Sequence, residues 1–177
     1  IEDVLAFRPE LEQVSWCPGA FYLKARPAFT FDPLFHAGAY YVQEASSMYV
    51  AEVLKQFVPL DRPLVALDLC AAPGGKSTLL QSIIPDGSLL VSNEPIAKRS
   101  QILSENMQKW TRGLSAGAPN CIVTQNFPAE FGALTGQVDV LLTDVPCSGE
   151  GMFRKDEDAV REWSLENVRM CQQRQRD

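Results

Sequence analysis

The sequence lacks any basic excess. Among its 177 residues, 16 are Lys or Arg and 22 are Asp or Glu, which gives a formal net charge of −6. Proteins that bind nucleic acid through its phosphates usually carry a basic excess or a basic stripe. Composition therefore offers no argument for an RNA partner, and any such argument must come from motifs.

Long hydrophobic runs and paired cysteines are also missing. The longest apolar runs, such as residues 64–67, are far shorter than the roughly 20 residues of a membrane span, which excludes a membrane protein. The five cysteines are widely spaced without a Cys-x-x-Cys pair, as expected of a reduced cytoplasmic protein without zinc or another metal. Neither an initiator Met nor a signal peptide opens the sequence, so we expect it to be part of a longer protein.

Apolar runs alternate with segments that favour helices. Strands are predicted over four short runs: 64–70, 88–94, 121–126 and 138–145. Helices are predicted over 43–57, 75–84, 97–110 and, in the charged tail, 157–176. This alternation is typical of an α/β fold whose parallel sheet is covered on both faces, with ligands at the carboxyl ends of its strands. Residues 1–42 are predicted to form loops and short strands that lead into a core over 43–177.

The loop after the first predicted strand, residues 68–78, reads Asp-Leu-Cys-Ala-Ala-Pro-Gly-Gly-Lys-Ser-Thr. Its small residues let a ligand approach the backbone, and the following helix offers free N–H groups to a phosphate or a carboxylate. A phosphate-binding Walker loop matches Gly75-Lys76-Ser77, but its first glycine would be Cys70, and Pro73 removes a backbone donor. An ATP-binding protein therefore stays an alternative.

Glu94 ends the second predicted strand, 20 positions after Gly74. Dinucleotide-binding folds place an acid at this distance, where it accepts both ribose hydroxyls. A nucleoside that carries an amino-acid tail satisfies both the loop and the acid. S-adenosylmethionine is such a molecule.

The fourth predicted strand leads into Asp144-Val-Pro-Cys147-Ser-Gly-Glu-Gly. Proline makes this turn stiff, so that its side chains project into the crevice beside the cofactor. A thiolate that adds to carbon 6 of a pyrimidine makes carbon 5 nucleophilic towards an activated methyl group, and a carboxylate near the base assists. Cys147 and Asp144 are candidates for these two groups.

Three motifs, at residues 68–76, 92–94 (Ser-Asn-Glu) and 144–156 (Asp-Val-Pro-Cys-Ser-Gly-Glu-Gly-Met-Phe-Arg-Lys-Asp), resemble the Nop/Sun-type RNA cytosine-5 methyltransferases. Residues 16–18 and 38–44 make the chain similar to the bacterial small-subunit ribosomal RNA methyltransferase F group. The resemblance implies a Rossmann-like class I methyltransferase core. It also implies methyl transfer from S-adenosylmethionine to carbon 5 of a cytosine in RNA, with small-subunit ribosomal RNA as the partner.

The same resemblance assigns roles to residues of this sequence. Glu94 would hold the ribose, Asp144 would lie near the methyl group and the target base, and Asn126 would contact the adenine, with Gln125 as a competing register. The residues that would cradle the methionine part are Cys70, Ala71, Ala72, Pro73, Gly74, Gly75 and Lys76.

The resemblance also indicates what the sequence does not contain. Cys147 would assist product release, whereas the family's nucleophile lies in a later Thr-Cys-Ser/Thr motif that this sequence lacks. The chain is therefore expected to bind cofactor but to turn over poorly or not at all, and to lack its last strands. An open sheet edge predicts partial instability or oligomerisation. A non-catalytic RNA-assembly module is the further alternative.

Basic residues near these motifs are candidates for an RNA path, against the alternative of a solvated face. They are Lys76, Arg154, Lys155, Arg161 and Arg169. His36 and Cys171 have no motif partner, and we expect structural roles for both.

Overall fold

The computed structural model describes residues 12–23, 28–112, 114 and 118–176. At its centre lies a four-stranded parallel sheet of β3 (Val65–Asp68), β4 (Leu89–Asn93), β5 (Asn120–Thr124) and β6 (Val140–Leu142), in the order β5-β4-β3-β6. β3, β4 and β6 lie inside predicted apolar runs, β5 begins one residue before its predicted run, and the α/β class is confirmed. Because all strands run in one direction, their carboxyl ends meet at one edge of the sheet.

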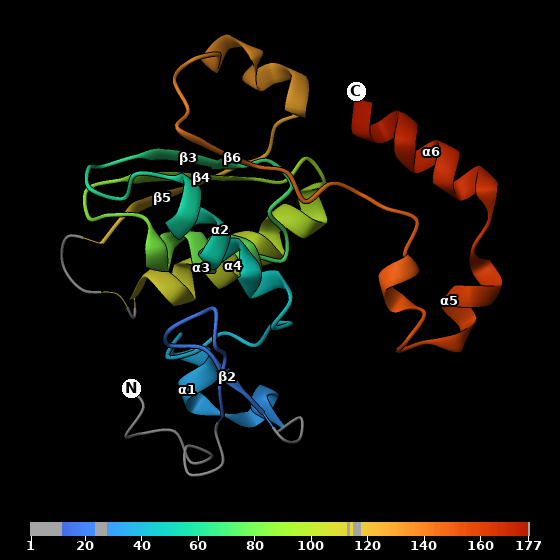
Figure 1. Ribbon diagram of the computed structural model, residues 1–177, viewed down its shortest axis with the longest axis horizontal. Coiled ribbons are helices and arrows are strands. Elements are labelled where there is room, and N and C mark those ends of the chain that lie inside the picture. Colours follow the sequence, from blue (N-terminus) through green and yellow to red (C-terminus); the bar gives the residue numbers. More distant parts are fainter. Residues whose placement is uncertain (1–11, 24–27, 113, 115–117, 177) are drawn as a thin grey trace.

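Three helices pack against one face of this sheet (Figure 1). They are α2 (Val50–Phe57), α3 (Gly75–Ile83) and α4 (Ala97–Arg112). Leu80 of α3, Leu90 of β4 and Leu103 of α4 are fully buried between helices and sheet. The short helix η4 (Pro128–Leu134), which the apolar pattern did not predict, lies on the other side of the sheet (Figure 1).

The N-terminal part contains short strands and also two short helical elements that the prediction of loops and short strands did not include. It contains the antiparallel pair β1 (Glu12–Gln13) and β2 (Phe21–Tyr22), the turn η2 (Phe29–Phe31) and the helix α1 (Pro33–His36). Val14 and Cys17 pack with Ala51 of α2 and Leu79 of α3 in a second buried cluster. This cluster fixes the N-terminal part to the core. Predictions for residues 1–11 and 24–27 lie outside the described residues.

At Gly38 the backbone of the N-terminal part lies directly against the backbone of α4. Its φ of +77° lies in the left-handed region, and a Cβ at this position would lie 2.0 Å from the carbonyl oxygen of Lys109. No side chain fits there, so glycine is required both by the turn and by the close approach of two backbones.

Two helix predictions were wrong at their boundaries. The first helix begins with the 3₁₀ turn η3 (Ser47–Tyr49), so residues 43–46 are not helical. The helix predicted over 157–176 is divided into α5 (Glu157–Glu162) and α6 (Leu165–Arg176), and the short turn η5 (Glu150–Met152) precedes them. Trp163 is extended with ψ of 137°, and the Ser164 hydroxyl accepts a hydrogen bond from Asn167 N at 3.2 Å, which starts a new helix.

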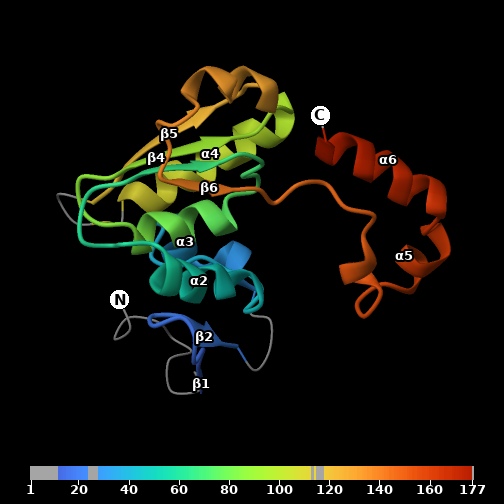
Figure 2. The ribbon, with the colours of Figure 1, turned by 45° about the horizontal axis from the view of Figure 1, so that its top comes forward.

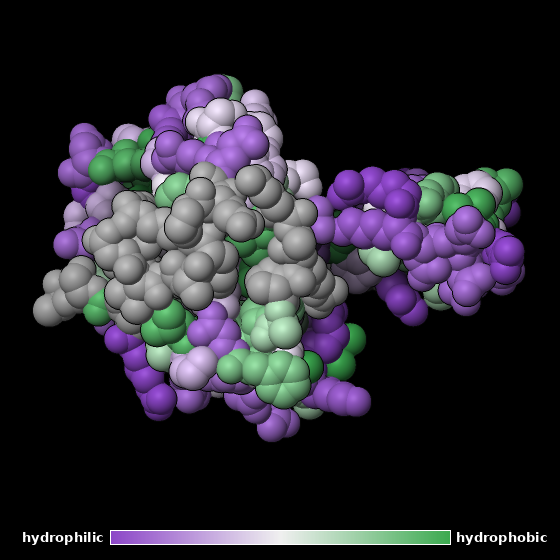
Figure 3. All heavy atoms as spheres, turned by 90° about the horizontal axis from the view of Figure 1, so that it is seen from below, coloured by the Kyte–Doolittle hydropathy of each residue, from purple (hydrophilic) through white to green (hydrophobic). Residues whose placement is uncertain are grey.

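The α5–α6 arm extends away from the sheet (Figure 2). Its surface is mainly hydrophilic with apolar atoms among the charged ones (Figure 3). The edge strand β6 pairs with β3 on one side and with no other described strand. None of the helices in the described ranges is long and apolar enough to cross a membrane.

Candidate functional site

The loop between β3 and α3 turns sharply into the helix. Gly74 adopts a φ of +118°, which side chains rarely tolerate, and thereby directs the chain into α3. Gly75 is the first helical residue, and a Cβ there would lie 3.0 Å from Gln43 Oε1. Glycine is needed at these two positions for different reasons. Gly74 allows the left-handed backbone of the turn, and Gly75 leaves space for the side chain of Gln43.

A cavity of about 230 Å³ lies at the carboxyl ends of β3 and β6. Its lining includes Asp144 and most of the predicted loop residues: Cys70, Ala71, Ala72, Pro73, Gly75 and Lys76. The rest of the lining was not predicted: Tyr41, Val42, Gln43, Ser47 and Asp68. Three separate parts of the sequence thus meet around one space.

Lys76 and Asp144 form an ion pair across this cavity. Lys76 Nζ, from the first turn of α3, donates to Asp144 Oδ2, which follows β6. The pair brings together the two motifs that the sequence separates by 68 positions. It also bears on the ATP-binding alternative, because a phosphate at this loop would compete with Asp144 for the lysine.

Asp68 is the most buried acid at the cavity. Its side chain is 0% exposed, and its Oδ2 accepts a hydrogen bond from Ser77 Oγ at 2.7 Å. Ser77 Oγ in turn accepts from Ser92 Oγ at 2.8 Å. Burial raises the pKa of the Asp68 carboxyl to about 6, the Ser77 hydrogen bond lowers it, and the charge of Asp144 raises it further.

Two buried acceptors at the cavity have no hydrogen-bond donor among the described residues. They are Asp68 Oδ1 and Gln43 Oε1. A buried acceptor without a donor is costly, so a ligand that supplies one is favoured at this place. The ammonium group of an amino acid is such a donor.

Glu94 lies beside the cavity and not in its lining. It is 1% exposed, and its Oε1 accepts from Ile96 N at 3.0 Å. Its Oε2 lies 3.2 Å from Arg99 Nη1 but, within the described part of the chain, receives no hydrogen bond. Arg99 Nη2 also donates to Ala72 O at 3.0 Å, which links Glu94 to the glycine loop.

Asn93 joins the ends of three strands. Its side-chain amide donates to Leu69 O and to Asn126 O, each at 3.0 Å, and its Oδ1 accepts from Asn126 N at 2.9 Å. The backbone of Asn126 is thus fixed beside Glu94, whereas Gln125 is exposed. Both stay candidates for the adenine contact.

The cysteines have different environments. Cys147 is exposed and lies outside the cavity lining. Burial and the charges of Glu94 and Asp68 raise the pKa of the Cys70 thiol, which disfavours a thiolate there. Cys171 is buried on α6.

The predicted basic residues of the tail do not line the cavity. Arg154 and Lys155 both pair with Glu44, and Arg161 pairs with Asp158 inside α5. His36 Nε2 lies 2.8 Å from Thr30 O, a local contact in the N-terminal part.

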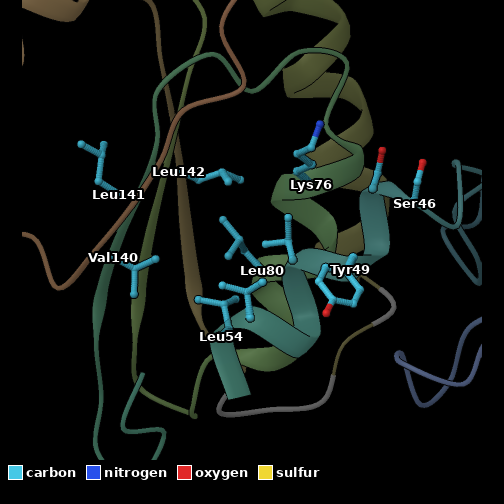
Figure 4. Close-up of a pocket in the computed structure, with 11 residues that line it drawn as sticks. Ser46, Tyr49, Leu54, Lys76, Leu80, Val140, Leu141 and Leu142 are labelled. Atoms are coloured by element: carbon cyan, nitrogen blue, oxygen red, sulfur yellow. The ribbon is translucent and has the colours of Figure 1, made fainter. Parts of the chain in front are cut away.

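A larger cavity of about 470 Å³ lies between α2 and β6 (Figure 4). Leu54, Leu80, Val140 and Leu142 make it mainly apolar. Among the described residues, Lys76 is the one charged residue that lines it, and Lys76 also lines the smaller cavity. The two carboxylates that line a cavity, Asp68 and Asp144, both belong to the smaller one.

The smaller cavity and its surroundings fit S-adenosylmethionine. The first turn of α3 offers backbone N–H groups to a carboxylate, the two acceptors without donors suit an ammonium group, and Glu94 Oε2 suits a ribose hydroxyl. These are groups that this ligand presents together.

Comparison with known families agrees with this geometry. Residues 58–177 match the family described as 16S rRNA methyltransferase RsmB/F. The chain belongs to this RsmB/F methyltransferase family. In addition, residues 1–45 match the N-terminal domain of 16S rRNA methyltransferase RsmF. The resemblance inferred from the three motifs is confirmed.

Curated relatives within the RsmB/F family are longer than this chain. Ribosomal RNA small subunit methyltransferase F of Aeromonas hydrophila is 36% identical over 165 residues, which cover 90% of this chain and 33% of the relative. The protein of the same name from Shewanella oneidensis is 38% identical over 160 residues, covering 89% and 32%. The chain thus spans about a third of the length of these relatives.

Solved structures share the fold. A methyltransferase homolog protein from Pyrococcus horikoshii is 29% identical with a TM-score of 0.62, covering 85% of this chain and 47% of the other. NSun6 from the same organism, solved with SFG, is 24% identical with a TM-score of 0.67, covering 85% and 36%. The Rossmann-like methyltransferase fold is confirmed.

Proposed function

We propose that the protein transfers a methyl group from S-adenosylmethionine to carbon 5 of a cytosine in RNA, with small-subunit ribosomal RNA as its substrate. Membership of the RsmB/F family supports the reaction class. The observation that carries the proposal is the cavity where the glycine loop, buried Asp68 and Asp144 meet. An RNA substrate also favours a cytoplasmic location.

Cofactor binding is divided among three segments. Backbone N–H groups at the start of α3 bind the carboxylate, with Cys70 to Lys76 shaping the cradle. Glu94 accepts the ribose hydroxyls, and Asn126 or Gln125 contacts the adenine. The bound cofactor supplies an activated methyl group. Residues 1–42 lead into this core of 43–177, and they support it through the packing of Val14 and Cys17 on α2 and α3.

The Pro-Cys loop supplies the groups that act on the base. Asp144 accepts a hydrogen bond from the target cytosine, and Lys76 keeps that carboxylate oriented. Cys147 is exposed, so its thiol can reach a base taken out of its stack, where it assists product release. Because the sequence has no Thr-Cys-Ser/Thr motif, this chain alone binds the cofactor and turns over poorly or not at all.

Calorimetric titration tests the proposal. We expect saturable binding of S-adenosylmethionine, no binding of ATP with magnesium, and binding at least about tenfold weaker in Glu94→Ala, since a lost hydrogen bond to a charged group costs about 1.5–3 kcal/mol. Glu105→Ala, an exposed change on α4, is the matched control. Binding of ATP alone would contradict the proposal, and melting curves of both variants would show that they fold.

A further inference from the structure

Residues 41–44 contact both loops that the proposed reaction needs. Tyr41 donates its hydroxyl to Pro73 O at 3.4 Å, and Gln43 lies against Gly75, so this segment forms one wall of the cofactor cavity. The next residue, Glu44, contacts a different part of the chain. Its partners lie 110 and 111 positions later, after the Pro-Cys loop.

The Glu44 carboxylate binds two cations at once. Its Oε2 accepts from Arg154 Nη2 at 3.0 Å, and its Oε1 accepts from Lys155 Nζ. The side chain of Glu44 is about half exposed, yet both oxygens are engaged, and the two cations lower the pKa of this carboxyl. Arg154 and Lys155, expected from the sequence to line an RNA path, are thus held by an acid of the protein itself.

The cations are fixed to the turn that follows the Pro-Cys loop. Lys155 N donates to Met152 O at 2.8 Å, and the side chain of Glu150 accepts from Ser148 Oγ at 2.6 Å and from Trp163 Nε1 at 2.8 Å. These hydrogen bonds connect Lys155 to the turn at residues 148–152, so the position of Lys155 affects the position of that turn. At the other end of the loop, Asp144 is held by Lys76.

Cys147 therefore lies between two anchors. We infer that Glu44 is a positioning residue, which holds Arg154 and Lys155 so that the Pro-Cys loop stays at the mouth of the cofactor cavity. The inference rests on the proposed function, because it makes Glu44 the link between the cavity wall and the loop that acts on the base. Filling of the cavity then stabilises the loop through residues 41–44.

Limited proteolysis with trypsin measures the anchor directly, because Arg154 and Lys155 must leave Glu44 before the protease can cleave after them. We expect Glu44→Gln to accelerate cleavage at these two sites about two- to fivefold, which is the size of effect typical of exposed ion pairs. Cleavage after Arg161 is the internal reference, since its partner Asp158 is local. Glu52→Gln is the matched control, because this acid contacts Gln56 within α2.

Charge reversal separates pairing from a general loss of structure. Glu44→Lys alone places three cations together and accelerates cleavage after Arg154 more than Glu44→Gln does. Combining it with Lys155→Glu restores one ion pair, so the rate after Arg154 returns towards the wild-type value. Equal rates in the wild type and Glu44→Gln, or no rescue in the double variant, would overturn the inference.

The link to the cavity is tested by adding S-adenosylmethionine. In the wild type we expect the cofactor to slow cleavage at Arg154 and Lys155 at least about twofold, and in Glu44→Gln to have no effect at these sites. Equal protection in both proteins would contradict the link. If calorimetry shows no cofactor binding at all, the proposed function fails instead, while the rates measured without cofactor still report on the anchor.

Discussion

Asp68 makes the stability of the protein depend on pH in a predictable direction. Burial raises its pKa from the ordinary 3.8 to about 6. The folded state therefore holds this proton more tightly than the unfolded state, so the contribution of Asp68 is complete below about pH 4 and is lost as the pH rises through about 6. A shift of about two units corresponds to about 3 kcal/mol.

Asp68→Asn removes this dependence while it keeps an acceptor for Ser77 Oγ. We expect the free energy of unfolding of the wild type, minus that of Asp68→Asn, to fall by about 2.5 kcal/mol between pH 4 and pH 7.5. Denaturant unfolding at four pH values in this range measures it. Subtraction removes the contributions of the carboxyl groups that do not interact with Asp68.

Asp139→Asn is the control for the direction of the pH dependence, because the pKa of this carboxyl is shifted the opposite way. Arg62 holds the pKa of the Asp139 carboxyl below its usual value, so its contribution is lost only as the pH falls further, and the difference from the wild type should be constant over the same range. If the free energies of unfolding of the wild type and Asp68→Asn change in parallel with pH, the reasoning that assigns a raised pKa to Asp68 is refuted.

Two further predictions concern packing. Gly19 and Gly38 both have positive φ, but a Cβ on Gly19 meets no atom within 4 Å, whereas one on Gly38 meets Lys109 O at 2.0 Å. Gly19→Ala should lower the free energy of unfolding by about 1 kcal/mol through backbone conformation alone, and Gly38→Ala should lower it by about 2–4 kcal/mol. Equal losses in thermal or denaturant unfolding would show that the backbone at residue 38 moves away from Lys109 without cost. Leu80→Ala should cost about 2–5 kcal/mol because Leu80 is fully buried, whereas Leu141→Ala, at 59% exposure, should change the free energy of unfolding by less than about 0.5 kcal/mol. A similar loss in both would mean that the sheet face around Leu141 is covered in solution.

The sequence predicted those parts of the fold and of the candidate site whose residues are neighbours in the chain. The apolar runs located the four strands of the sheet, and the glycine loop and Asp144 fell at strand ends, where parallel topology brings them together. The boundary errors have a physical cause. Hydrophobic periodicity continues across Trp163 and Ser164, so the hydroxyl that starts α6 has no signature in the apolar pattern.

The cavity wall at residues 41–43 and the role of Glu44 could not be read from spacing. Glu44 meets its partners only after the chain has passed through the whole sheet, and no local rule relates residues 110 positions apart. Asp68 belongs to a motif that the sequence shows. That its Oδ2 accepts a hydrogen bond from Ser77 while its buried Oδ1 has no donor among the described residues follows only from the folded structure. Such features become visible only in three dimensions.

The order of the strands also affects how the protein is made. β3 lies between β4, which follows it closely in the chain, and β6, which follows it about 70 residues later. At roughly 5–20 residues per second, a ribosome delivers β6 several seconds after β3. During that interval one edge of β3 has no neighbour, and unpaired strand edges favour aggregation. While residues 69–139 are being synthesised, a chaperone that covers this edge of β3 would therefore protect the chain.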